Sequence, residues 1–130
     1  MAEIAELYVF LHCDIEHSEQ IIYTMSKELT IEDIQEIVAK DESRYLELKQ
    51  STGELYKAMT SACAFLNTDG GWVMFGITPK LKIVGQNVTD PTRQEIANAL
   101  RKFEPAIDIP VQYVEIPEKE GFYVIAMYFN

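Results

Sequence analysis

Three side chains suited to a polyanion stand close together in the sequence, at Arg44, Tyr45 and Lys49. Arginine and lysine contact phosphate oxygens, and a tyrosine ring can stack on a nucleobase. Glu47 lies on the same face of the expected strand as Lys49, because side chains two residues apart in a strand point the same way. The pair therefore predicts either a phosphate contact by Lys49 or a structural ion pair between the two side chains.

Further basic residues that could contact phosphate are scattered along the chain, at Lys57, Arg93 and Arg101. These three are candidates for nucleic-acid contact, although scattered surface bases are usually only solvated.

Histidine and cysteine contribute little chemistry. His12 and His17 are five residues apart, which does not place both imidazoles on one helical face as a spacing of four would, so we expect ordinary surface histidines and no metal site there. Cys13 and Cys63 stand in different surroundings and indicate neither a disulfide framework nor a zinc site. Reduced thiols fit a cytoplasmic protein.

The net charge of −10 argues against a polyanion ligand, because nucleic-acid affinity depends on Lys and Arg neutralising phosphates. The charge is unevenly distributed along the chain. Residues 1–40 hold nine acidic and two basic residues, whereas residues 41–130 hold twelve acidic and nine basic residues. The acidic N-terminus also differs from the basic start of a signal peptide, and no apolar run is long enough for a membrane helix. We therefore expect no membrane association and no secretion.

The first forty residues predict an acidic helical appendage, with a boundary to the main domain of residues 41–130. An apolar stripe with alternating steps of four and three predicts a helix or helical hairpin over residues 4–29. Thr30 and Asp33 predict the N-terminal cap of a helix over residues 31–40. The stripe could dock to another copy of the chain, giving a homodimer, or cover the chain's own sheet.

Residues 45–129 predict the element order βαββαββ. Alternating apolar and polar residues from Tyr45 indicate a half-buried strand. Ser51 and Glu54 resemble a capping box before a helix that ends near Asn67. Residues 72–77 are apolar on both faces, as expected of a central strand. A shorter strand at 82–86, a helix capped by Asp90, and two strands at 109–116 and 122–129 follow. We predict an α+β fold of two layers, with a mixed, mostly antiparallel sheet and helices on one face.

Two spaced motifs give the chain a resemblance to a known family. Residues 42–51 read ESRYLELKQS, and residues 61–77 read SACAFLNTDGGWVMFGI, followed by KIVG at 82–85. Together they resemble the Schlafen AlbA-type domain family. The resemblance implies a DNA-binding or RNA-binding domain of the kind found in transcriptional regulators. ATP binding is not expected, because the chain has no G-x-x-x-x-G-K-[ST] and Asp69-Gly70-Gly71 leads into a strand.

The resemblance also implies a possible catalytic site. Some relatives are metal-dependent endoribonucleases that use three carboxylates, and the first two positions match Glu42 and Glu47. Grouped carboxylates hold divalent cations that activate water. The third position is Thr78, whose neutral hydroxyl is not an equivalent ligand. Asp69 or Asp90 could substitute, although nothing in their spacing requires it.

The sequence therefore predicts a nucleic-acid-binding regulatory module, DNA or RNA, without catalysis and without a cofactor. A first alternative is an endoribonuclease that uses Glu42 and Glu47 with Mg²⁺ or Mn²⁺. A second is a protein-interaction or dimerisation domain.

Overall fold

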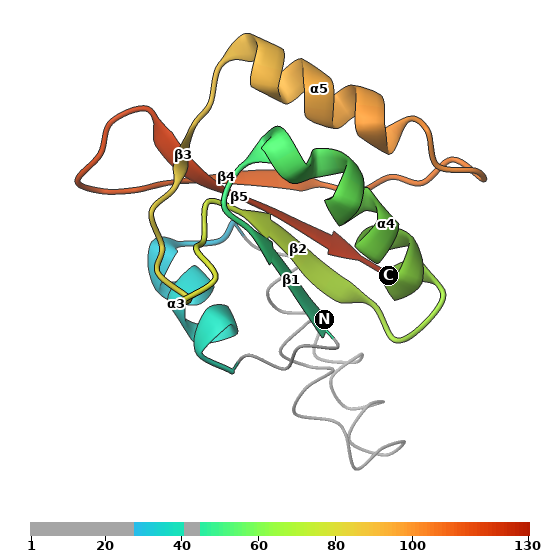
Figure 1. Cartoon of the computed structure of the whole chain (residues 1–130), viewed down its shortest axis with the longest axis horizontal. Helices are drawn as coiled ribbons and strands as arrows, with labels where there is room; N and C mark the ends of the chain where they lie inside the picture. The colour runs from blue at the N-terminus through green and yellow to red at the C-terminus, as the bar shows by residue number, and fades with distance from the viewer. Residues whose placement is uncertain (1–27, 41–44) are drawn as a thin grey trace.

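The computed structural model describes residues 28–40 and 45–130. Five strands form one sheet: β1 (Leu46–Lys49), β2 (Gly71–Phe75), β3 (Gln86–Asn87), β4 (Val111–Glu115) and β5 (Phe122–Phe129). Within these two described ranges, three α-helices accompany it, α3 (Ile31–Lys40), α4 (Leu55–Leu66) and α5 (Asp90–Leu100), with a short 3₁₀ helix, η2 (Thr52–Glu54), before α4. Figure 1 shows the arrangement, which confirms the predicted α+β fold.

Strand β5 organises the sheet, because it pairs with three other strands. It is antiparallel to β2, β3 and β4, whereas β1 and β2 are parallel and are connected through α4. Tyr123 pairs with both Gln86 and Glu115, so β3 and β4 lie on opposite edges of β5. The sheet is therefore mixed and mostly antiparallel, as predicted.

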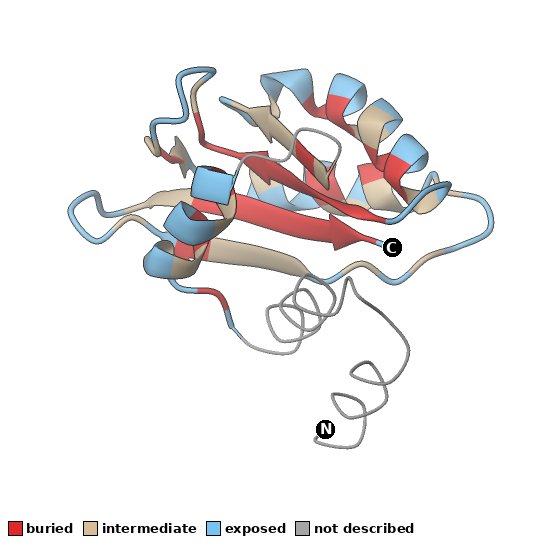
Figure 2. Ribbon diagram, turned by 90° about the horizontal axis from the view of Figure 1, so that it is seen from below, coloured by how far each residue is buried: buried red, intermediate tan, exposed pale blue. Residues whose placement is uncertain are grey.

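The helices of the βαββαββ order, α4 and α5, cover one face of the sheet, as predicted, while α3 covers the other (Figure 1). Strand β2 is buried on both faces, because its alternate side chains pack in two hydrophobic cores on opposite sides of the sheet. Val73 and Phe75 pack in the core beneath α4 and α5, and Trp72 and Met74 pack in the core beneath α3. Figure 2 shows the central strands as a buried layer, with exposed residues on the outer helix surfaces and loops.

Helix α3 begins and ends where the sequence predicts. The Thr30 N–H donates to Asp33 Oδ2 at 2.9 Å, and the Asp33 N–H donates to Thr30 Oγ1 at 3.2 Å, which is a reciprocal capping box. Ile34 and Val38 then face the sheet. The stripe predicted over residues 4–29 lies almost entirely outside the described residues, with His12, Cys13 and His17, so self-association through it and the boundary at residue 41 stay predictions.

Two local predictions were wrong. The strand expected at residues 82–86 is an isolated bridge between Ile77 and Ile83 followed by the two-residue β3. Gly85 has φ +70°, and both its N–H and that of Val84 donate to the carbonyl of Gly76, so the extended chain is interrupted there. The cap of α5 is Thr89 instead of Asp90.

The remaining differences are small. Thr92 Oγ1 accepts the Thr89 N–H at 3.1 Å, which places Asp90 inside the first turn of α5. Strand β4 begins at Val111, later than predicted, because Pro110 before it has no N–H to donate to a neighbouring strand. Ser51 does cap a helix start, but its hydroxyl accepts from Gly53 N–H at 3.2 Å in η2.

Candidate nucleic-acid interface

A groove of about 410 Å³ runs between α5 and the segment that leads into β4. One wall comes from α5, where Arg93, Ala97 and Arg101 succeed one another at steps of four along the helix and its C-terminal cap. Residues four apart lie on one helical face, so the two arginines flank a small alanine across about 12 Å of helix rise. The fold therefore brings together two of the basic residues that the sequence left scattered.

Tyr113 of β4 holds one of these arginines in place. The guanidinium carbon of Arg93 lies 4.0 Å from the centre of the Tyr113 ring, within the range of a cation–π contact. Burial raises the pKa of the Tyr113 hydroxyl, and the positive charge of Arg93 lowers it in part. A guanidinium stacked on a ring has fewer orientations to lose on binding, so Arg93 is partly preorganised for an anion.

The opposite wall of the groove is mainly apolar. It includes Ile107, Ile109 and Val111, which follow the turn after α5. Asp108 also lines the groove and is exposed. Two cations and one anion give the lining a net positive charge, whereas the whole chain carries −10.

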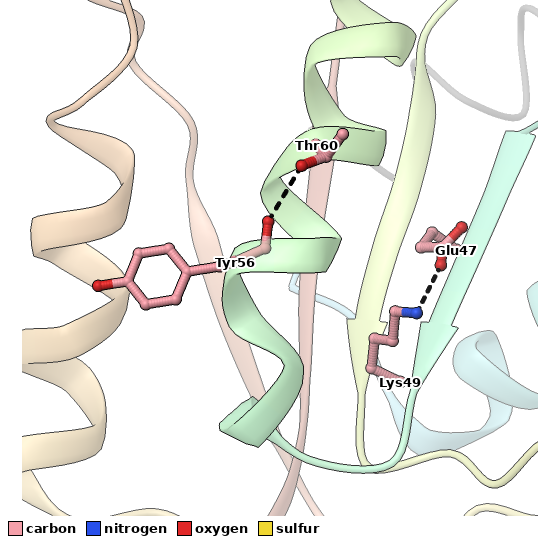
Figure 3. Close-up of polar contacts among 4 residues, drawn as sticks. All are labelled: Glu47, Lys49, Tyr56 and Thr60. Carbon is pink, nitrogen blue, oxygen red and sulfur yellow. Dashed lines mark hydrogen bonds and ion pairs between the residues drawn. The ribbon is translucent and has the colours of Figure 1, made fainter.

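A second cation–ring pair joins the C-terminal end of α5 to the first turn of α4. Tyr56 in the first turn of α4 is 72% exposed, the largest exposure of a large hydrophobic side chain among the described residues. Figure 3 shows its ring pointing from α4 toward α5. The ammonium of Lys102 lies 5.0 Å from the centre of this ring, and Lys102 follows Arg101 directly. Thr60 donates to the Tyr56 carbonyl at 3.3 Å, within α4.

Tyr56, Lys102 and Tyr113 belong to the candidate site, although they are not among the residues predicted from the sequence. The signal for Tyr56 was present, because the apolar face of α4 is set by Leu55, Ala58 and Ala62, and a tyrosine off that face has no core to enter. The partnership of Tyr113 with Arg93 gave no signal, since the two residues belong to different elements.

At the β1 edge the structure shows an ion pair. Lys49 Nζ lies 3.0 Å from Glu47 Oε1, with side-chain exposures of 18% and 30% (Figure 3). The positive charge of Lys49 is thus matched within the chain, which is the structural interpretation of this pair. Tyr45 is half-buried beside them in sequence, and Arg44 lies outside the described residues. Lys57 is exposed on α4 and does not line the groove.

The carboxylate positions of the nuclease alternative do not form a metal site in the described part of the chain. Glu42 lies outside it, and Glu47 is paired with Lys49. The Thr78 hydroxyl accepts the Lys82 N–H at 3.1 Å and so organises the turn after β2. Residues 28–40 and 45–130 contain no group of three His, Cys, Asp or Glu side chains that could hold a metal ion. Because Glu42 lies outside those residues, the nuclease alternative stays a prediction, and no catalytic step follows from the described residues.

Residues 42–130 match the family model described as Schlafen, AlbA_2, which covers more than half of the chain. The chain belongs to this family. The resemblance seen in residues 42–86 is confirmed, and membership in the Schlafen AlbA_2 family is compatible with a nucleic-acid-related regulatory domain. A comparison with curated proteins finds no match. Within residues 28–40 and 45–130, no helix is both long and apolar enough to cross a bilayer.

The longer Schlafen motif has a structural role in this chain. Asn67 is the C-terminal cap of α4, and its amide donates to the Cys63 carbonyl at 3.1 Å. Gly70 has φ +91°, and a Cβ on Gly71 would lie 2.7 Å from the Phe65 ring. Both glycines are therefore required for α4 to turn back tightly into β2. The motif builds the helix-to-strand connection, whereas the groove on α5 lies outside it.

Proposed function

We propose that this Schlafen AlbA_2 domain is a non-catalytic module that binds nucleic acid through the groove beside α5. The observation that carries the proposal is the convergence of Arg93 and Arg101 on one groove. Guanidinium groups make paired, charge-assisted hydrogen bonds to phosphate oxygens, and two of them about 12 Å apart along a helix can contact separate phosphates. Family membership supports the same role.

The distribution of charge sets the strength of binding. A net charge of −10 repels a polyanion at long range, so local contacts must supply the affinity. Most of the excess acid belongs to residues 1–40, and salt screens exposed charges beyond about 10 Å at moderate ionic strength. We therefore expect weak binding that depends on a few phosphate contacts, with affinity falling as salt rises.

The test compares two charge-matched double variants in fluorescence anisotropy with labelled DNA and RNA at low salt. Arg93→Ala with Arg101→Ala removes both groove cations. Lys80→Ala with Lys82→Ala removes two exposed cations from the turn after β2, which lies away from α5 (Figure 1). The first variant should lose most of the binding, and the second should retain it.

The salt dependence supplies a second readout. The slope of log affinity against log salt should flatten by about 0.7 for each lost contact to a single strand and about 0.9 for a duplex. No binding of any nucleic acid at low salt, or an equal loss in both double variants, would overturn the proposal.

A further inference from the structure

Two cation–ring pairs accompany α5: Arg93 with Tyr113 on the groove side, and Lys102 with Tyr56 of α4. Arg93 stacks on Tyr113 at one end of the groove, Arg101 flanks its other end, and Lys102 lies 5.0 Å from the Tyr56 ring. We propose that the surface from Arg93 to Tyr56 is a track for single-stranded nucleic acid, in which an unpaired base stacks on Tyr56 and another enters the groove. The inference rests on the proposed function and specifies its substrate.

The exposure of Tyr56 is the first argument for an unpaired strand. A ring that is 72% exposed gains little of the free energy that comes from burying apolar surface. Among the described residues, the other exposed large hydrophobic side chain is Leu81, at 39%. In a duplex the faces of the bases stack on one another and only their edges are accessible in the grooves. The flat face of Tyr56 therefore matches a base that has left the stack.

The lining of the groove is the second argument. Its apolar side chains, among them Ile96, Leu100 and Ile107, offer a base no hydrogen-bond donors or acceptors for reading its edge. They can, however, contact its apolar faces, and the volume of about 410 Å³ lies within the range of pockets that hold small organic groups. A concave apolar site flanked by guanidinium groups suits a base with phosphates on both sides.

The order of charges is the third argument. Arg101 and Lys102 are adjacent, with Arg101 on the groove and Lys102 at Tyr56, so the two aromatic positions are joined by neighbouring cations. A single strand likewise carries phosphates between its bases. Because stacking and phosphate contacts do not depend on base identity, we expect little sequence preference.

The experiment measures binding of the full chain to labelled single strands of about 12 nucleotides and to hairpin duplexes of the same composition, in DNA and in RNA. Single strands should bind more tightly than duplexes. Tyr56→Ala should weaken single-strand binding by about 5- to 100-fold, as expected for one stacked base, and leave the weaker duplex binding unchanged. Tyr56→Phe retains the ring and should bind like the natural chain.

The outcomes separate this inference from the proposed function. The single-strand track is wrong if duplexes bind as tightly as single strands. It is also wrong if Tyr56→Ala leaves single-strand binding unchanged while the double variant Arg93→Ala with Arg101→Ala abolishes it. In either case the proposed nucleic-acid binding is retained. If no nucleic acid binds the natural chain, both the single-strand track and the proposed function are wrong. Circular dichroism of each variant checks the fold, and because Tyr56 is exposed its replacement should not disturb the core.

Discussion

Arg93 of α5 and Tyr113 of β4 form a stacked pair, with the guanidinium carbon 4.0 Å from the ring centre. The pair connects the helix that forms one wall of the groove to the strand at its far side. Its electrostatic consequence can be measured without any ligand, because the charge of Arg93 lowers the pKa of the Tyr113 hydroxyl against the larger effect of burial.

Replacing Arg93 should therefore raise the pKa of Tyr113 further. Arg93→Ala removes the positive charge that favours tyrosinate, whereas Arg93→Lys keeps a cation near the ring. Titration of the Tyr113 ring by NMR should show the increase in the alanine variant and a smaller change in the lysine variant. An unchanged Tyr113 titration in Arg93→Ala would contradict the stacked geometry.

Asp108 should oppose binding, because its carboxylate lines the same groove as the two arginines. Asp108→Asn removes one negative charge with little change in shape, and we expect nucleic-acid affinity to rise by several-fold at low salt and by less at high salt. Anisotropy measures the effect, and Glu118→Asn, on the exposed turn between β4 and β5, is the control for net charge. Equal gains in both variants would show that only the overall charge matters.

Gln112 of β4 should anchor the chain before α3 to the sheet. The Leu29 N–H donates to Gln112 Oε1 at 2.7 Å, and Leu29 itself is only 4% exposed. Gln112→Ala leaves that amide without its acceptor and should lower the free energy of unfolding by about 1–3 kcal/mol. Amide hydrogen exchange at Leu29 should become faster, while Gln112→Glu, which keeps an acceptor oxygen at this position, should protect the amide. Unaltered exchange in the alanine variant would argue against the anchor.

Gly76 and Gly121 should respond differently to alanine, although both have positive φ, +100° and +82°. A Cβ on Gly121 would meet only Asn87 Oδ1 at 3.7 Å, so the cost is the left-handed backbone alone, about 1–2 kcal/mol. A Cβ on Gly76 would lie 2.9 Å from Gly85 Cα, and the backbone would also have to move. Urea unfolding should show a clearly larger loss for Gly76→Ala. Equal losses would mean that this close approach is not present.

Tyr128 should make stability fall at high pH. Burial, followed by the nearby Tyr45 and Asp69, raises its pKa from 10.0 to about 12. The folded chain thus holds the phenolic proton more tightly than the unfolded chain does. The resulting stability is complete below pH 10 and is lost as pH rises toward about 12, by about 2–3 kcal/mol in total.

The variant Tyr128→Phe has no proton to lose at this position. Urea unfolding at a series of pH values should therefore show a smaller decline across this range for Tyr128→Phe than for the natural chain. Parallel declines in the two proteins would contradict the shifted pKa.

Much of the architecture follows from local patterns. The capping pair Thr30 and Asp33, the two-faced apolar run of β2 and the bounds of β5 were all predictable, because each depends on residues that are neighbours in the chain. The break near Gly85 was not, because it depends on a left-handed glycine whose N–H donates to the distant Gly76 carbonyl.

The sequence by itself determined the family, the element order and which residues are basic. Only the tertiary structure decided what those basic residues meet: it stacked Arg93 of α5 on Tyr113 of β4, and it placed the segment before β4 opposite Arg93 and Arg101 to form the groove. The physical reason is that periodicity reports the direction in which a side chain points from its own helix or strand. Whether two such side chains meet depends on how separate elements pack, and that packing is set by the shared core between them.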